Sequence, residues 1–122
     1  MKVLRVDDSV AIQQSFGALL EAAPGIEVIG YAADVTSALA SIASNPPDLI
    51  VLDSNLRGHD HGIDVLLCVR QRHSGIKVVM LSNRSWASMR KKYIDAGALE
   101  YFDKGIEFQQ ARDFIAELAH AS

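Results

Sequence analysis

Hydrophobic and polar positions along the chain follow two alternating patterns. Short apolar runs predict five strands, over residues 2–6, 26–32, 48–53, 76–81 and 99–102. After each strand, apolar residues recur at helical spacing and predict five helices, over residues 9–23, 35–44, 62–73, 85–97 and 107–120. Strands that alternate with helices form βαβ units. The pattern therefore predicts an α/β domain whose parallel sheet has helices on both faces.

Local signals support several of these elements. Ser9 is a candidate N-cap of the first helix, and Pro24-Gly25 is a stop signal for it. The continuous apolar run of residues 48–53 is typical of a strand covered on both faces. The last helix has apolar residues at core spacing: Phe108, Ala111, Ile115 and Leu118.

The 122 residues suffice for one domain with a sizeable core, so we expect a single domain over residues 1–122 with no output domain. The net charge of −3 gives no long-range attraction to nucleic acid, so we expect no direct nucleic-acid binding. The single cysteine, Cys68, excludes an intrachain disulfide, fits a reducing compartment and is expected in the core. No apolar run resembles a signal peptide or a membrane span, so we expect a cytoplasmic protein without membrane contact.

Polar residues gather at the ends of four of the five predicted strands. In open parallel sheets, ligands bind beyond the carboxyl ends of the strands. The strand assignments bring these residues to one edge of the sheet: Asp7 and Asp8 after the first strand, Asp53 at the end of the third, Ser82 and Asn83 after the fourth, and Lys104 past the fifth.

A structural role explains each of these residues taken alone. Paired acids near a helix start are common caps, and a lone aspartate at a strand end is a common turn former. A serine there is often a helix cap, and a lysine is often a solvated surface residue. Their convergence on one edge favours a site, because independent surface residues rarely gather in this way.

Three clustered carboxylates supply hard oxygen ligands, which suit Mg²⁺ or Mn²⁺, and the His/Cys ligand set of a zinc site is missing. For His59, Asp60 and His61, in the loop of residues 54–62, a polar turn is the favoured interpretation. The sequence has no glycine-rich phosphate loop of the dinucleotide or P-loop type. No histidine lies at the predicted edge, so a nucleophilic triad is disfavoured.

The segments "VDDS", "PDLIVLD" and "AGALEYFDK", together with Ser82, resemble the receiver domain of bacterial response regulators. The resemblance covers residues 2 to about 119. It implies a flavodoxin-like (βα)5 three-layer sandwich with a five-stranded parallel sheet of order 2-1-3-4-5.

The resemblance also implies roles for individual residues. Asp53 would accept a phosphoryl group from a phosphohistidine on a sensor histidine kinase or phosphotransfer protein. Asp8 would bind Mg²⁺ directly, Asp7 mainly through water, and Asp53 and the backbone carbonyl of Asn55 would be further ligands. Two residues would contact phosphoryl oxygens: Ser82 through a hydrogen bond and Lys104 through an ion pair.

Tyr101 matches the aromatic switch position of the family. If Ser82 moved towards the phosphoryl group, Tyr101 would rotate inward and bias a face made of the fourth helix, fifth strand and fifth helix. This face is also where we expect a homodimer to form. Trp86, Arg90 and Tyr93 would belong to it, although ordinary packing explains Trp86 and Tyr93 equally well.

The sequence departs from the family pattern in two places. Gly105 follows Lys104 where proline in a cis peptide bond is common, and without proline a cis bond costs about 2.5–4 kcal/mol. In the loop of residues 54–62, Arg57 stands where proline is usual and Gly62 comes one residue late. That loop would reshape access to Asp53 or contact a partner. Arg84 would either shield the phosphoryl group from water or be solvated.

Three function classes compete. A phosphorylatable receiver catalyses only transfer to itself and slow self-hydrolysis, so it is not a conventional enzyme. A pseudo-receiver keeps the fold and signals through protein contacts without phosphorylation, which Gly105 and the altered loop leave open. A flavodoxin-like cofactor enzyme is disfavoured, since carboxylates repel a phosphate. The domain either acts alone or belongs to a longer helix-turn-helix regulator, and we expect its kinase to dock on the first helix near Val10, Ala11 and Gln14.

Overall fold

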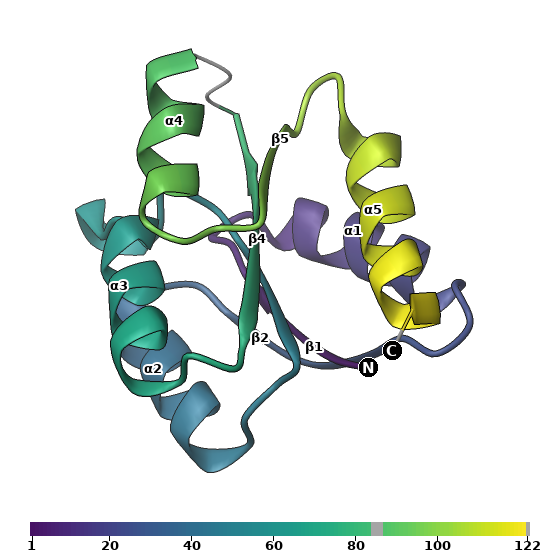
Figure 1. Ribbon diagram of the computed structural model, residues 1–122, viewed down its shortest axis with the longest axis horizontal. Coiled ribbons are helices and arrows are strands. Elements are labelled where there is room, and N and C mark those ends of the chain that lie inside the picture. The colour runs from purple at the N-terminus through teal and green to yellow at the C-terminus, as the bar shows by residue number, and fades with distance from the viewer. Residues whose placement is uncertain (84–86, 122) are drawn as a thin grey trace.

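The computed structural model describes residues 1–83 and 87–121. Its sheet has five parallel strands in the order β2-β1-β3-β4-β5 (Figure 1). The strands are β1 (Lys2–Val6), β2 (Glu27–Ala32), β3 (Leu49–Leu52), β4 (Lys77–Ser82) and β5 (Glu100–Asp103). The helices are α1 (Val10–Glu21), α2 (Val35–Ser44), α3 (Gly62–Arg72), α4 (Ala87–Asp95) and α5 (Phe108–Ala121), with a short 3-10 helix η1 (Arg57–His59).

The predicted fold class and strand order are confirmed. Strand and helix limits agree with the predicted ones to within two residues, and those of β1 and α2 coincide with them. The predicted first residues of the fourth helix, 85 and 86, lie outside the described part of the chain. Ser9 caps α1 as predicted, because its hydroxyl accepts a 3.3 Å hydrogen bond from the backbone amide of Ile12. The η1 turn was not predicted. It contains Gly58 with a φ of 70°, a conformation that glycine adopts without strain.

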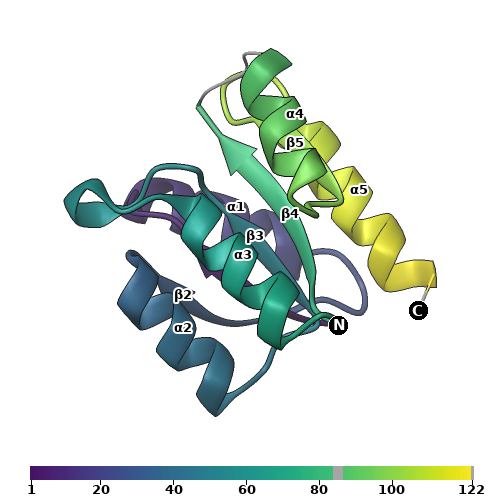
Figure 2. The same cartoon turned by 60° about the vertical axis from the view of Figure 1, so that its left-hand side comes forward.

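The molecule has three layers, with the sheet in the middle. Figure 2 shows α2, α3 and α4 together on one side of the sheet, and α1 and α5 cover the other side (Figure 1). Two apolar clusters match these layers: one packs residues of α2, α3 and α4 on the sheet, and the other packs α1 and α5 on it. All four residues of β3 are buried, as the continuous apolar run predicts.

Most of the apolar residues that recur at helical spacing are buried, as predicted. In α5, Ala111 and Ile115 are fully buried, while Phe108 and Leu118 are half-buried and pack against the same cluster. Cys68 corrects a prediction, because it is half-buried and belongs to neither cluster. In α3 the buried face is centred on Val65, Leu66 and Val69, and Cys68 lies at the border of that face.

Two further expectations concern the backbone and the membrane. None of the described residues has a cis peptide bond, in agreement with glycine at position 105. Among these residues, no helix combines the length and the apolar character that crossing a bilayer requires.

Candidate functional site

The backbone holds the candidate residues at one edge of the sheet. The backbone hydrogen bonds of the parallel sheet continue one residue past the strands. The amide of the first residue after a strand donates to a carbonyl at the end of the neighbouring strand. Asp7 donates to Ala32 over 2.9 Å. Asp53 donates to Val6 at the same distance. Lys104 likewise donates to Ser82, the last residue of β4, over 2.9 Å. The sheet itself therefore positions these side chains.

Lys104 lies at the centre of the site. Its ammonium nitrogen is 2.6 Å from Oδ2 of Asp7 and 2.7 Å from Oδ2 of Asp53. The residue is only 8% exposed, which excludes the interpretation of a solvated surface lysine. A single cation thus joins the carboxylates that follow β1 and β3.

The three predicted metal ligands come together. One carboxylate oxygen from each of Asp7, Asp8 and Asp53 lies within 4.8 Å of the others. Asp7 and Asp53 are buried, whereas Asp8 is exposed to solvent. Ligands on opposite sides of Mg²⁺ are about 4.2 Å apart, so this spacing and the all-oxygen chemistry fit that ion.

Burial disfavours the charged form of Asp53. Loss of hydration raises the pKa of its carboxyl group, while the hydrogen bond and charge of Lys104 and the amide of Asn55 lower it in part. The negative charge of Asp7 adds to the upward shift. An ionised Asp53 is therefore held at a cost in folding free energy, and its oxygen is poorly solvated.

Ser82 contacts the residue next to Asp53. Its hydroxyl oxygen lies 2.5 Å from that of Ser54, and both residues are buried. This places Ser82 beside the carboxylate cluster, and a hydroxyl there is a ready donor for a phosphoryl oxygen. The hydrogen bond with Ser54 was not predicted from the sequence.

The family model of the response regulator receiver domain matches residues 3–116. The chain belongs to the response regulator receiver family. The transcriptional regulatory protein LiaR of Bacillus subtilis is 33% identical over 117 residues, which cover 94% of this chain and 54% of LiaR. A protein-glutamate methylesterase/protein-glutamine glutaminase of a Nocardioides species is 34% identical over 106 residues, which cover 85% of this chain and 29% of that protein.

A solved structure supports the same fold. The response regulator domain of Thermotoga maritima CheB superposes with a TM-score of 0.84 at 23% identity, covering 99% of this chain and 94% of that one. In the two sequence comparisons, this chain spans about half of the length of LiaR and less than a third of that of the methylesterase. Receiver domains generally bind Mg²⁺ in an acidic pocket, and the aspartate cluster of this chain has that character.

The unusual loop of this receiver is tied to the neighbouring β2–α2 turn. Oδ2 of Asp60 accepts a 2.9 Å hydrogen bond from the amide of Val35, the first residue of α2. The amide of Arg57 donates to the carbonyl of Ala33 over 2.9 Å. These bonds fasten the loop to the β2–α2 turn and to the start of α2.

The tyrosines of the expected switch face are packed inside. Tyr101 is 4% exposed, and its ring centroid lies 5.8 Å from that of Tyr93, which is also buried. The ring of Tyr101 is thus already inward in this conformation. On the surface beside it, Arg90 of α4 pairs with Glu100 of β5. Trp86 and Arg84, which the sequence also singles out, lie outside the described residues.

Sequence reasoning missed the burial of Arg5. This residue is in β1, is 0% exposed and has its guanidinium 4.0 Å from Oδ2 of Asp7. A signal was present, because side chains two residues apart on a strand share a face. Arg5 and Asp7 are two residues apart at the end of β1, and the other residues of that strand are mostly apolar.

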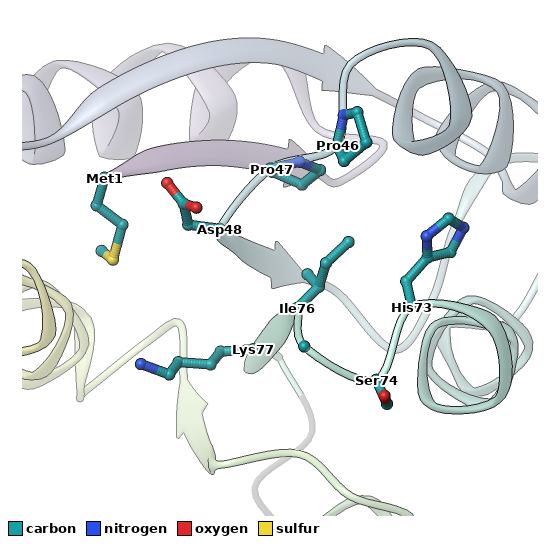
Figure 3. Close-up of a pocket in the computed structure, with 9 residues that line it drawn as sticks. Met1, Pro46, Pro47, Asp48, His73, Ser74, Ile76 and Lys77 are labelled. Atoms are coloured by element: carbon teal, nitrogen blue, oxygen red, sulfur yellow. The ribbon is translucent and has the colours of Figure 1, made fainter. Parts of the chain in front are cut away.

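A separate hollow lies at the opposite edge of the receiver sheet. Figure 3 shows Met1, Asp48 and Lys77 around it, at the beginnings of β1, β3 and β4. The cavity measures about 610 Å³ and is also lined by the loops before β3 and β4. None of the predicted site residues lines it.

Proposed function

We propose that this receiver takes a phosphoryl group from a phosphohistidine of a sensor histidine kinase or phosphotransfer protein onto Asp53. The observation that carries the proposal is the contact of the Lys104 ammonium with the carboxylates of both Asp7 and Asp53. Phosphoryl transfer requires positioning and charge neutralisation more than covalent assistance. A buried lysine on the accepting carboxylate supplies both.

In the reaction, an Oδ atom of Asp53 attacks phosphorus while the phosphorus–nitrogen bond of the donor breaks. The imidazole nitrogen keeps the electron pair of that bond and takes up a proton from the solvent. Asp53 becomes an acyl phosphate: its carboxylate loses its charge as the oxygen–phosphorus bond forms, and the phosphoryl oxygens bring their own negative charge to the site. Lys104 then pairs with one phosphoryl oxygen, and the hydroxyl of Ser82 donates a hydrogen bond to another.

The acidic cluster would hold Mg²⁺, with Mn²⁺ as an alternative. Asp8 and Asp53 would bind the ion directly, Asp7 through water, and the backbone carbonyl of Asn55 would complete the protein ligands. When bound, the ion neutralises charge on the phosphoryl group during transfer. The paired carboxylates after β1 are then tolerated because cations face them.

The output would pass through the face formed by α4, β5 and α5. Ser82 moves to the phosphoryl group and changes the packing around the buried ring of Tyr101. The ion pair of Arg90 with Glu100 links α4 to β5 and lies on this face, where a homodimer would form. LiaR is a transcriptional regulatory protein, which favours a DNA-binding output domain outside residues 1–122 over direct DNA contact by the receiver itself.

The kinase would dock beside the acidic cluster. Val10 at the start of α1 is 61% exposed, and Ile106 in the loop before α5 is 77% exposed. Both lie on the edge of the sheet that carries Asp53 and Lys104. Exposed apolar residues around a reactive carboxylate fit a protein partner better than a small substrate. A cytoplasmic location is part of this proposal.

The mass of the intact protein, measured after incubation with a small-molecule phosphodonor, tests the proposal. The wild type should gain one phosphoryl group in the presence of Mg²⁺ and none when the ion is chelated. Asp53→Asn should gain none, and Asp48→Asn, at the opposite edge, should behave as the wild type. If the wild type gains nothing from phosphodonors and from a panel of phosphorylated kinases, the pseudo-receiver becomes the better account.

A further inference from the structure

Arg5 places a buried positive charge beneath the acidic cluster. The side chain is 0% exposed, on a strand that lies between two others in the sheet. Its guanidinium carbon lies 4.8 Å from the ring centroid of Phe16 in α1. Its Nη2 atom lies 4.0 Å from Oδ2 of Asp7, the same oxygen that Lys104 contacts at 2.6 Å. Two cations therefore share one carboxylate oxygen.

The charge of Arg5 persists in this environment. Burial lowers the pKa of the guanidinium to about 10, and the negative charges of Asp7 and Asp53 oppose that shift. A group with a pKa near that value is protonated at neutral pH. Burying a charge without need is costly, since an apolar side chain of similar volume is often as stable or more stable at such a position.

We propose that Arg5 is a positioning residue that acts through Asp7 and sets the affinity of the acidic cluster for Mg²⁺. This inference rests on the proposed function of the cluster. Three carboxylates face two buried cations, Lys104 and Arg5, so the cluster has one net negative charge. Loss of Arg5 doubles that charge and removes a repulsive neighbour of the metal.

The position of Arg5 also suits the phosphorylated state. Lys104 is shared between Asp7 and Asp53, and in the proposed reaction it pairs with a phosphoryl oxygen. Arg5 is held by its own strand on the side of Asp7. It keeps a positive charge 4.0 Å from that carboxylate when Lys104 moves to the phosphoryl group.

Titration with MgCl₂, followed through the backbone amide shifts of the cluster in ¹H–¹⁵N NMR spectra, tests this role. Arg5→Met should bind Mg²⁺ about three- to tenfold more tightly than the wild type, because a like charge close to the ion is gone. Arg5→Lys keeps the charge and should stay close to the wild type. Arg72→Met removes an exposed charge at the end of α3, at the far edge of the sheet, and should change nothing.

Whether Arg5→Met raises or lowers the affinity for Mg²⁺ distinguishes this role from a purely structural one. A variant that merely loosens the site binds Mg²⁺ more weakly, so unchanged or weaker binding by Arg5→Met overturns the inference. Should Arg5→Met fail to fold, Arg5→Gln provides the neutral side chain, with the same expected direction. If the wild type itself does not bind Mg²⁺, the metal site and this inference both fail, whereas phosphorylation of Asp53 is judged separately by the mass measurement.

Discussion

The hydroxyl oxygens of Ser54 and Ser82 lie 2.5 Å apart, in a buried hydrogen bond that joins the residue after Asp53 to the end of β4. In the proposed mechanism, Ser82 donates to a phosphoryl oxygen. To reach that oxygen, the hydroxyl of Ser82 must move away from Ser54, whichever of the two hydroxyls donates. The hydrogen bond thus favours the unphosphorylated state of the receiver.

Ser54→Ala should therefore speed phosphorylation by a small-molecule donor. A neutral hydrogen bond contributes about 0.5–1.5 kcal/mol, which corresponds to a roughly two- to tenfold faster reaction if the whole of it is lost on the way to the product. The rate is followed by the increase of the phosphorylated mass with time. Ser44→Ala, at the exposed end of α2, is the matched control and should leave the rate unchanged. A slower reaction of Ser54→Ala would show that the bond instead prepares Ser82 for its role.

Lys104→Met should destabilise the fold at neutral pH, because it leaves the buried carboxylates of Asp7 and Asp53 without their shared cation. Breaking a buried pair by removing one partner costs about 3–5 kcal/mol. Urea denaturation should show this loss, and MgCl₂ should restore part of it by placing a cation on the same carboxylates. The control Lys77→Met changes an exposed lysine at the start of β4. Equal stability of the two variants would contradict the central position of Lys104.

Asp53→Asn should stabilise the receiver at neutral pH, because it removes a charge that burial disfavours. The pKa of Asp53 is raised in the folded state above the ordinary value of 3.8. The unfolded chain therefore ionises first, and the wild type loses stability as the pH rises from 3.8 through the folded pKa.

The free energy of unfolding of Asp53→Asn should accordingly equal that of the wild type below pH 3.8. It should exceed that of the wild type by the full amount only above the pKa that Asp53 has in the folded state. Urea denaturation of both proteins across this pH range measures it. Asp113→Asn, which alters an exposed pair with Arg112, should show almost no difference. An advantage for Asp53→Asn that grows as the pH falls would mean that the wild-type carboxylate is stabilised, not strained.

Gly62→Ala should destabilise the protein strongly, although the substitution adds only one methyl group. A Cβ atom at this position would lie 2.1 Å from the backbone oxygen of Asp53, and backbone cannot give way as a flexible side chain can. We expect a loss of several kcal/mol in the free energy of unfolding. Gly75→Ala, where a Cβ meets nothing within 4 Å, is the control. A Gly62→Ala protein as stable as the control would show that the loop after Asp53 moves freely.

The sequence predicted the fold because periodicity in βα units is a local property of the chain. Each strand is a short apolar run, and each helix repeats its apolar residues at the helical period. The residues at the site edge follow from the strand ends alone. The backbone amides of Asp7, Asp53 and Lys104 each donate to the neighbouring strand and so extend the sheet by one residue, which means that a correct strand assignment also places these residues at one edge.

The contacts that the sequence did not predict depend on side-chain packing between distant segments. Ser54 and Ser82 are 28 residues apart, and Asp60 reaches α2 across 25 residues. Neither pair has a periodic signal. The burial of Arg5 was missed for another reason: its charge predicts exposure, and only its pairing with Asp7 and the stacking on Phe16 make burial tolerable.

The central claim is that Asp53 becomes an acyl phosphate, and borohydride reduction tests it most directly. Borohydride converts an aspartyl phosphate into homoserine, which peptide mass spectrometry locates in the chain. After phosphorylation in the presence of Mg²⁺, we predict homoserine at position 53 and unmodified aspartate at positions 7 and 8. Homoserine at position 7 or 8, or a phosphoryl group on a residue other than an aspartate, would contradict the account.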